Sequence, residues 1–344
     1  MCNSRGGSLD EQFTLDQFTP THMENKVENV DTSSYQRIIW LRFALLLVGL
    51  FAIGFAPILM KFSISEITPN ATIFNRFWIA SLVFGIWSTR QMICNNSSND
   101  ISSGQEKLYS PKTVGMILLA GSFLAGIQLM WAWSLSRTSV ASSVTILHGL
   151  RPLLTALGGW ILFKNRYDSK FLFGMIMASI GAVLIGFNDF SESIYKLQGD
   201  FLSVLSAIFS ALELLIIERL LTQFTTQTLM FWFCAISSLI TIIFLITTGD
   251  IFFPVSWRGW LAVIGLALVC QVIGQGLITY SLNYLSPAFV AVSMVIDPII
   301  SSLFAWMILN EKLTILTSIF CCIVLLGIYL SLSSQYAVKT EEIA

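Results

Sequence analysis

Two ionisable residues of opposite charge lie in the middle of long apolar segments. Arg151 is the twelfth residue of the segment 140–163, and Asp297 is the twelfth residue of the segment 286–309. A charge at the centre of a bilayer costs about 2.5–3.5 kcal/mol on insertion scales, so each needs a partner or a function. We therefore expect Arg151 and Asp297 to approach each other. Three interpretations stay open: a static pair that fixes the packing, a pair that gates the protein or contacts a substrate, or no contact between the two residues.

Glu213 is a third ionisable residue within an apolar segment. Ser203, Ser206, Ser210 and Glu213 are spaced so that they share one helix face. Small residues such as serine often line helix interfaces in membranes, but helix packing does not require a carboxylate. A buried carboxyl group can take up and release a proton, so we hypothesise proton coupling through Glu213 or Asp297.

Further polar side chains share faces with these groups. His148 lies one helical turn before Arg151, while Ser293 and Ser301 lie one turn before and after Asp297. His148 fits either a proton relay or a hydrogen-bonded structural role. The helical spacing also groups two other pairs of candidate residues: Gln128 with Trp131, and Gln271 with Gln275. With Ser210, these complete the polar candidates for binding inside the apolar segments.

Three residues are candidates for gating. Arg76 lies near the start of an apolar segment, so we expect it to extend to the outer membrane boundary, as Lys61 does. Its gating role on that side is implied only by the family resemblance described below. Pro152 and Pro298 are candidates for breaking their helices, because proline removes a backbone hydrogen bond. A simple kink is the alternative at both prolines.

The composition predicts a membrane-embedded framework for these groups. Of 344 residues, 55% are hydrophobic and only 11% are charged, which leaves too few polar side chains to cover a water-soluble surface. A helix needs about 20 apolar residues to cross a bilayer, and a helix satisfies its own backbone groups. Ten segments meet this description: 38–60, 74–94, 114–135, 140–163, 170–187, 199–219, 228–247, 257–283, 286–309 and 313–334.

The terminal segments and the distribution of basic residues predict in which membrane the protein lies and how it is oriented. Residues 1–37 and 335–344 are polar and are predicted to be terminal tails, the first of them disordered. Lys and Arg are more frequent on the side that the termini share, so both termini are expected in the cytoplasm, in a multi-pass protein of the plasma or inner membrane. The net charge of −1 gives no basic field that would favour nucleic acid.

The second half of the chain resembles the first. Trp133-Ser134-Leu135 aligns with Tyr280-Ser281-Leu282, and Arg151-Pro152 aligns with Asp297-Pro298 at almost the same offset. The two copies are 38–187 and 199–334. Five spans per copy is an odd number, so the second copy must be inverted in the membrane. Inverted repeats recur in secondary transporters, whose substrate sites lie between the repeats.

The same residues resemble the EamA family of the drug/metabolite transporter superfamily. The resemblance is carried by Leu282-Asn283-Tyr284-Leu285-Ser286-Pro287-Ala288, by Pro298, by Leu309-Asn310-Glu311-Lys312-Leu313-Thr314, and by Pro69 seven residues before Arg76-Phe77. The first copy departs at Asn165, where the family usually has Glu. The resemblance implies ten helices, cytoplasmic termini and transport of amino acids, other metabolites or drugs, often outward.

These observations favour a secondary transporter. Alternating access between inverted repeats would export small metabolites such as amino acids. A broad exporter of drugs or aromatic cations is the alternative, and a membrane-embedded enzyme is a weaker one. The chain has no phosphate-binding G-x-x-x-x-G-K-[ST] motif and no metal-type cysteine spacing, so we expect neither catalytic residues, cofactors nor metals. The expected partners are a small-molecule substrate and the lipid bilayer, and both a monomer and a homodimer stay open.

Overall fold

The computed structural model describes residues 32–95, 110–138, 140–187, 194–309 and 315–334. Contacts divide the chain into two units, Met1–Arg42 and Phe43–Ala344. The described part of the first unit is the beginning of helix α2. That helix starts at Thr32, before residue 38, where we predicted the first span to begin. Of the predicted tails 1–37 and 335–344, residues 1–31 and 335–344 lie outside the described residues, whereas residues 32–37 belong to helix α2 and not to a disordered tail.

The described residues form helices and no β-strand. Their bounds are α2 Thr32–Gly54, α3 Ala56–Ile64, α4 Pro69–Asn95, α6 Pro111–Leu135, α7 Val140–Phe163, α8 Ser169–Phe187, α9 Ile194–Leu220, α10 Thr226–Thr248, α11 Trp257–Gly265, the π-helix η2 Leu266–Gln275, α12 Gly276–Ser281, α13 Pro287–Ser293, the 3₁₀-helix η3 Met294–Ile296, α14 Asp297–Leu309 and α15 Ile315–Leu332. The helical stretches coincide with the ten apolar segments, although three of those segments contain a break or a change of helix type.

Hydroxyl side chains begin several of these helices. Ser110, Thr225, Ser256 and Ser286 each accept a hydrogen bond from the backbone N–H three residues later. This N-cap satisfies one of the backbone donors that the first helical turn leaves unpaired. Proline follows the cap in α6 and α13, where its missing N–H costs nothing. Local sequence therefore sets these helix starts.

The breaks only partly follow the prolines. Helix α7 continues through Pro152, so the prediction of a break there is wrong. A membrane helix can continue through a proline because nearby groups can satisfy the one backbone carbonyl that loses its hydrogen bond. Near Pro298 the helix does change type, because the 3₁₀ turn Met294–Ile296 precedes α14. In the first span, α2 ends at Gly54 and α3 begins at Ala56.

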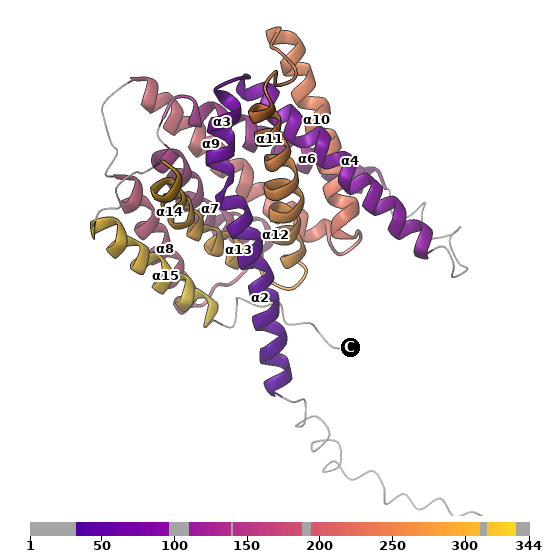
Figure 1. The fold of residues 1–344 in the computed structure, drawn as a ribbon. Coiled ribbons are helices and arrows are strands. Elements are labelled where there is room, and N and C mark those ends of the chain that lie inside the picture. Colours follow the sequence, from indigo (N-terminus) through magenta and orange to yellow (C-terminus); the bar gives the residue numbers. More distant parts are fainter. Residues whose placement is uncertain (1–31, 96–109, 139, 188–193, 310–314, 335–344) are drawn as a thin grey trace, which may run out of the picture. The chain divides into compact units, whose positions relative to one another are not determined.

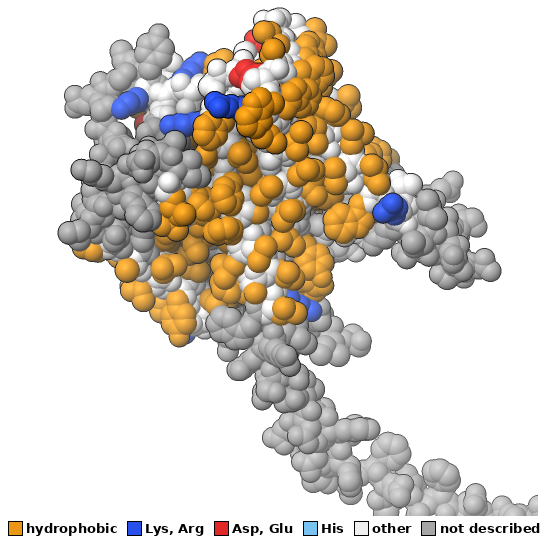
Figure 2. All heavy atoms as spheres, in the orientation of Figure 1, with side chains coloured by type: hydrophobic (Ala, Val, Ile, Leu, Met, Phe, Trp, Pro, Cys, Tyr) orange, Lys and Arg blue, Asp and Glu red, His pale blue; other side chains and the backbone are white. Residues whose placement is uncertain are grey.

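The surface is that of a multi-pass membrane protein. Six helical stretches in the described residues are long and apolar enough to cross a bilayer: Leu41–Ile64, Pro111–Leu135, Ser143–Phe163, Lys196–Leu220, Thr226–Thr248 and Trp257–Ser281. Figure 2 shows hydrophobic side chains across the middle of the viewed face, with charged side chains at its edges. The count of ten crossings stays a prediction.

Within the larger unit, helices distant in sequence pack in pairs. Helix α8 packs along α15, α4 along α10, and α6 along α9 (Figure 1). Helices α8 and α15 meet at glycines: a Cβ atom at Gly327 would lie 2.7 Å from the backbone oxygen of Gly174. Such close approach is typical of helix pairs that associate through small residues in membranes.

Candidate functional site

A polar cavity lies inside the larger unit, between the two halves of the sequence. It has about 40 Å³ of space for the centres of water-sized molecules, room for on the order of three waters. Helices α2, α3, α4, α6 and α7 line it from the first half, and η2, η3 and α14 from the second. The lining residues are Ile53, Ala56, Pro57, Arg76, Ile127, Gln128, Trp131, Val144, Leu147, His148, Arg151, Gln275, Met294, Asp297 and Ser301.

The carboxylate of Asp297 faces His148 in this cavity. Its Oδ2 lies 3.3 Å from His148 Nε2. The guanidinium of Arg151 instead places Nη1 2.8 Å from the sulfur of Met294. The predicted direct pairing of Arg151 with Asp297 is therefore wrong, although both side chains line the same cavity and interact electrostatically. His148 and Arg151 share a helix face one turn apart, so their spacing alone did not decide which of them reaches the carboxylate.

Arg76 points inward and joins helices of both halves. Its Nε donates to Gln271 Oε1 and its Nη1 donates to Gln128 Oε1, each at 2.9 Å. The side chain is only 2% exposed, so the prediction that it extends to the membrane boundary is wrong. Lys61 is exposed, in contrast. The two amide oxygens supply the acceptors that an Arg guanidinium in the bundle interior requires.

Unpartnered polar atoms concentrate at the cavity. In the described part of the chain, seven buried side-chain nitrogen and oxygen atoms lack a hydrogen-bond partner, and five belong to lining residues. Those five are Trp131 Nε1, His148 Nδ1, Arg151 Nε, Asp297 Oδ1 and Ser301 Oγ. Buried polar atoms are nearly always paired in folded proteins, so this group marks a place where a polar molecule can bind.

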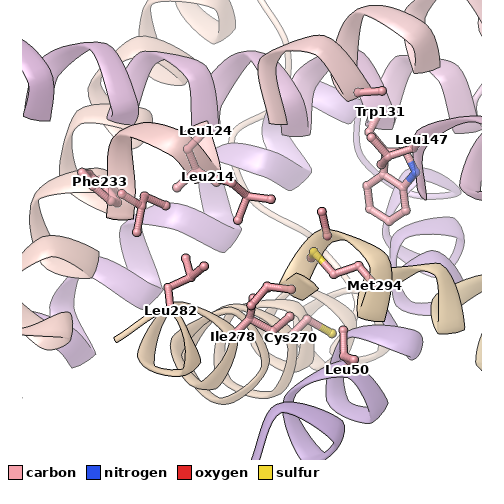
Figure 3. Packing of buried hydrophobic residues seen from close by; sticks show 14 of the residues in the cluster. Leu50, Leu124, Trp131, Leu147, Leu214, Phe233, Cys270, Ile278, Leu282 and Met294 are labelled. Carbon is pink, nitrogen blue, oxygen red and sulfur yellow. The ribbon is translucent and has the colours of Figure 1, made fainter. Parts of the chain in front are cut away.

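Trp131 forms one wall of the cavity with apolar neighbours. Figure 3 shows its indole ring beside Leu147 on α7, across from Met294. These side chains belong to the same packed core as Leu50 and Cys270. The cavity therefore combines apolar walls with a few polar groups, which is typical of small-molecule sites.

The structure brings together seven of the predicted candidates and leaves six outside the lining. Those at the cavity are Arg151, Asp297, His148, Gln128, Gln275, Trp131 and Arg76. Those outside it are Glu213, Gln271, Ser210, Ser293, Pro152 and Pro298. Gln271 still contacts the site through Arg76, and Glu213 is buried where it interacts electrostatically with Arg151. Ser293 donates to the Phe289 carbonyl oxygen of its own helix at 3.0 Å.

Sequence reasoning missed a second polar arrangement, between two loops. Glu66 follows α3 and accepts hydrogen bonds from Ser256 Oγ (2.6 Å) and from the backbone N–H groups of Val255 and Ser256, where α11 begins. The hydrogen bonds from Ser256 hold the pKa of Glu66 below its usual range. The carboxylate thus sits at the positive end of α11.

Asp250 makes the reciprocal contact. It follows α10 and accepts from Thr68 Oγ1 (2.9 Å) and Asn70 Nδ2 (3.1 Å) at the start of α4, and from Thr248 Oγ1 (2.6 Å). Burial of Asp250 opposes ionisation, but these hydrogen bonds together outweigh it and lower the pKa of Asp250. Each half of the chain therefore binds a helix start of the other half through a carboxylate. The only feature of the sequence that could have indicated these two contacts was an acidic residue in a short loop close to the start of a helix.

The fold and the cavity together define the class of protein: a multi-pass helical membrane protein with a polar cavity between the two halves of its sequence. The model of the EamA-like transporter family matches residues 40–187 and again residues 197–333. This chain belongs to the EamA-like transporter family.

Curated relatives include proteins named as transporters, and a solved structure shares the fold. The chain is 26% identical to an uncharacterized transporter of Archaeoglobus fulgidus, over 81% of this chain and 93% of the relative. It is 23% identical to the pseudopaline exporter CntI of Pseudomonas aeruginosa, over 59% of this chain and 69% of that protein. A solved crystal structure superimposes with a TM-score of 0.65 at 16% identity, covering 84% of this chain and 96% of the other, which supports the fold.

Proposed function

We propose that this protein is a secondary transporter that exports small metabolites, such as amino acids, through the polar cavity. The observation that carries the proposal is that both halves matched by the family model supply polar side chains to one cavity. Transport proceeds by alternating access, in which the two halves open the cavity to one side of the membrane and then to the other.

Helix contacts support the inverted repeat on which this mechanism depends. If α2–α3 corresponds to α9, α4 to α10, α6 to α11–α12, α7 to α13–α14 and α8 to α15, then contacts should recur in symmetric pairs. The contact of α6 with α9 has its counterpart in that of α11 with α3, and α6 with α10 has its counterpart in α4 with η2. The pairs α4–α10 and α8–α15 are their own counterparts, as expected near a pseudo-two-fold axis.

The proposal includes the membrane orientation and a role for protons. We place both termini in the cytoplasm and the protein in the plasma or inner membrane, as a monomer or a homodimer. His148 Nε2 and Asp297 Oδ2 lie 3.3 Å apart inside the cavity, which suits a pair that exchanges a proton during the cycle. Glu213 is an alternative proton site, but it lies outside the cavity lining.

Export of drugs or aromatic cations is the second candidate function. Trp131 and Asp297, an aromatic ring and an acid in one cavity, favour it. Arg76 and Arg151 oppose it, because two guanidinium groups line the same space. A membrane-embedded enzyme is the least supported alternative.

Metabolite profiling tests the proposal. The full chain is expressed in a host lacking its own exporters, and metabolites inside and outside the cells are compared with those for Asp297→Asn. Glu218→Gln, at the C-terminal end of α9 and outside the cavity, is the matched control. We expect a compound that leaves faster with the native chain and the control but not with Asp297→Asn. Equal efflux with and without the native chain, for every compound, would contradict export.

A further inference from the structure

Two of the unpartnered atoms at the cavity can only donate hydrogen bonds. The indole nitrogen of Trp131 and the Nε of Arg151 carry N–H groups with no lone pair to offer. Neither finds an acceptor in the described protein, and each side chain is only 5% exposed. A ligand that satisfies them must therefore bring acceptor oxygen or nitrogen atoms.

The positive charge of Arg151 further restricts which type of acceptor group the ligand can carry. Its electrostatic partners, Glu213 and Asp297, form no ion pair with it within hydrogen-bonding distance in the described structure, and Nη1 contacts only the weakly accepting Met294 sulfur. Sulfur satisfies a guanidinium poorly, whereas a carboxylate accepts strong, charge-assisted bonds from one. A carboxylate has two acceptor oxygens, so it can accept from both the Trp131 and the Arg151 N–H groups, whereas an amide has only one carbonyl oxygen to offer them.

Other groups of the same cavity call for a hydrogen-bond donor. Asp297 Oδ1 is an unpartnered acceptor, and the hydroxyl of Ser301, one turn along α14, is also unpartnered. A hydroxyl or amino group on the ligand would satisfy the Asp297 oxygen. The remaining lining is largely apolar and includes Ile53 and Val144, which would accommodate a hydrocarbon side chain.

We propose that the cavity binds a small organic acid whose carboxylate is held by Arg151 and Trp131 and whose hydroxyl or amino group faces Asp297. This inference rests on the proposed function and narrows its substrate class to carboxylates that carry a neighbouring donor. In this binding mode, Arg151 and Trp131 determine why the protein binds the acid more tightly than the corresponding amide.

Purified full-length protein in liposomes provides the test. Ligand affinity is measured by thermal stabilisation, and transport by charge movement on a supported membrane. The probes are three 2-hydroxy acids (lactate, 2-hydroxyisocaproate and 3-phenyllactate), the matching amino acids, and the amide of each. Arg151→Gln removes the guanidinium, and Trp131→Phe keeps a ring but removes the N–H. Arg90→Gln, on the exposed end of α4, is the control.

We expect at least one acid to bind and its amide to bind at least about tenfold more weakly, since a hydrogen bond to a charged group is lost. Arg151→Gln and Trp131→Phe should each weaken the acid by a similar factor, while Arg90→Gln should not. If Arg151→Gln does not fold, Trp131→Phe alone decides the matter.

Three results would overturn the inference: amides that bind as well as acids, a Trp131→Phe variant with native affinity, or no response to any acid. Export only of compounds that lack a carboxylate in the profiling experiment would remove this inference and leave the proposed function intact. Failure to export any compound would instead remove the proposed function itself.

Discussion

Replacing Arg76 with lysine tests whether its bonds to the two glutamines hold the halves of the protein together. Lysine keeps the positive charge, but its single ammonium cannot reproduce bonds made from Nε and Nη1 to oxygens on different helices. A hydrogen bond to a charged group contributes about 1.5–3 kcal/mol, and one of the two is lost. We therefore expect Arg76→Lys to lower the free energy of unfolding by about 1.5–3 kcal/mol.

Unfolding by SDS in mixed micelles measures this difference. Arg90→Lys is the matched control on the same helix, because Arg90 is exposed and surface substitutions usually change stability by less than about 0.5 kcal/mol. If Arg76→Lys were as stable as Arg90→Lys, then the bonds to Gln128 and Gln271 would not stabilise the fold.

Two further predictions concern the helix packing and the loops. Gly327→Ala should lower the free energy of unfolding by about 1–3 kcal/mol, because the added Cβ would lie 2.5 Å from the backbone nitrogen of Ala178, whereas Gly115→Ala, with nothing within 4 Å, should not; SDS unfolding of both variants measures this. Glu66→Ala removes the acceptor oxygens, so it should remove hydrogen-exchange protection from the Val255 and Ser256 amides, which mass spectrometry detects. In the native chain the pKa of Glu66 is lowered, so the contact should be fully formed above the ordinary glutamate pKa of about 4.3 and be lost as the pH falls through the lower pKa of the folded state. Unchanged protection in Glu66→Ala would contradict the contact.

The helices were largely predictable from the sequence, whereas only seven of the thirteen candidate residues line the cavity, and the hydrogen-bond partners of these residues were not predictable. Apolar length identifies helical segments because each helix satisfies its own backbone. Helical spacing also placed His148 and Arg151 on one face. Which of them meets Asp297 depends on how α7 lies against η3 and α14, and no local pattern encodes that.

Arg76 shows why the burial of a charged side chain was harder to predict than the helix that carries it. Near either end of a predicted span, an arginine side chain can extend to the membrane boundary or turn inward, and the outcome depends on hydrogen-bond acceptors from distant helices. Here those acceptors are Gln128 and Gln271, far away in the sequence. Helical spacing grouped Gln128 with Trp131 and Gln271 with Gln275, but it did not indicate a bond from either glutamine to Arg76.

The departures from regular α-helix in the described residues converge on the cavity. The break between α2 and α3 is followed by Ala56 and Pro57, the π-helix η2 ends at Gln275, and the 3₁₀ turn η3 begins at Met294; all four residues line the cavity. Irregular backbone at membrane depth is tolerated where it is buried or lines a cavity, and broken helices form the substrate sites of many transporters. Packing alone would not place three such irregularities around one space. The binding site that we propose between the two halves would account for their common location, because each irregular segment can change its pitch or bend without unfolding the helix that carries it.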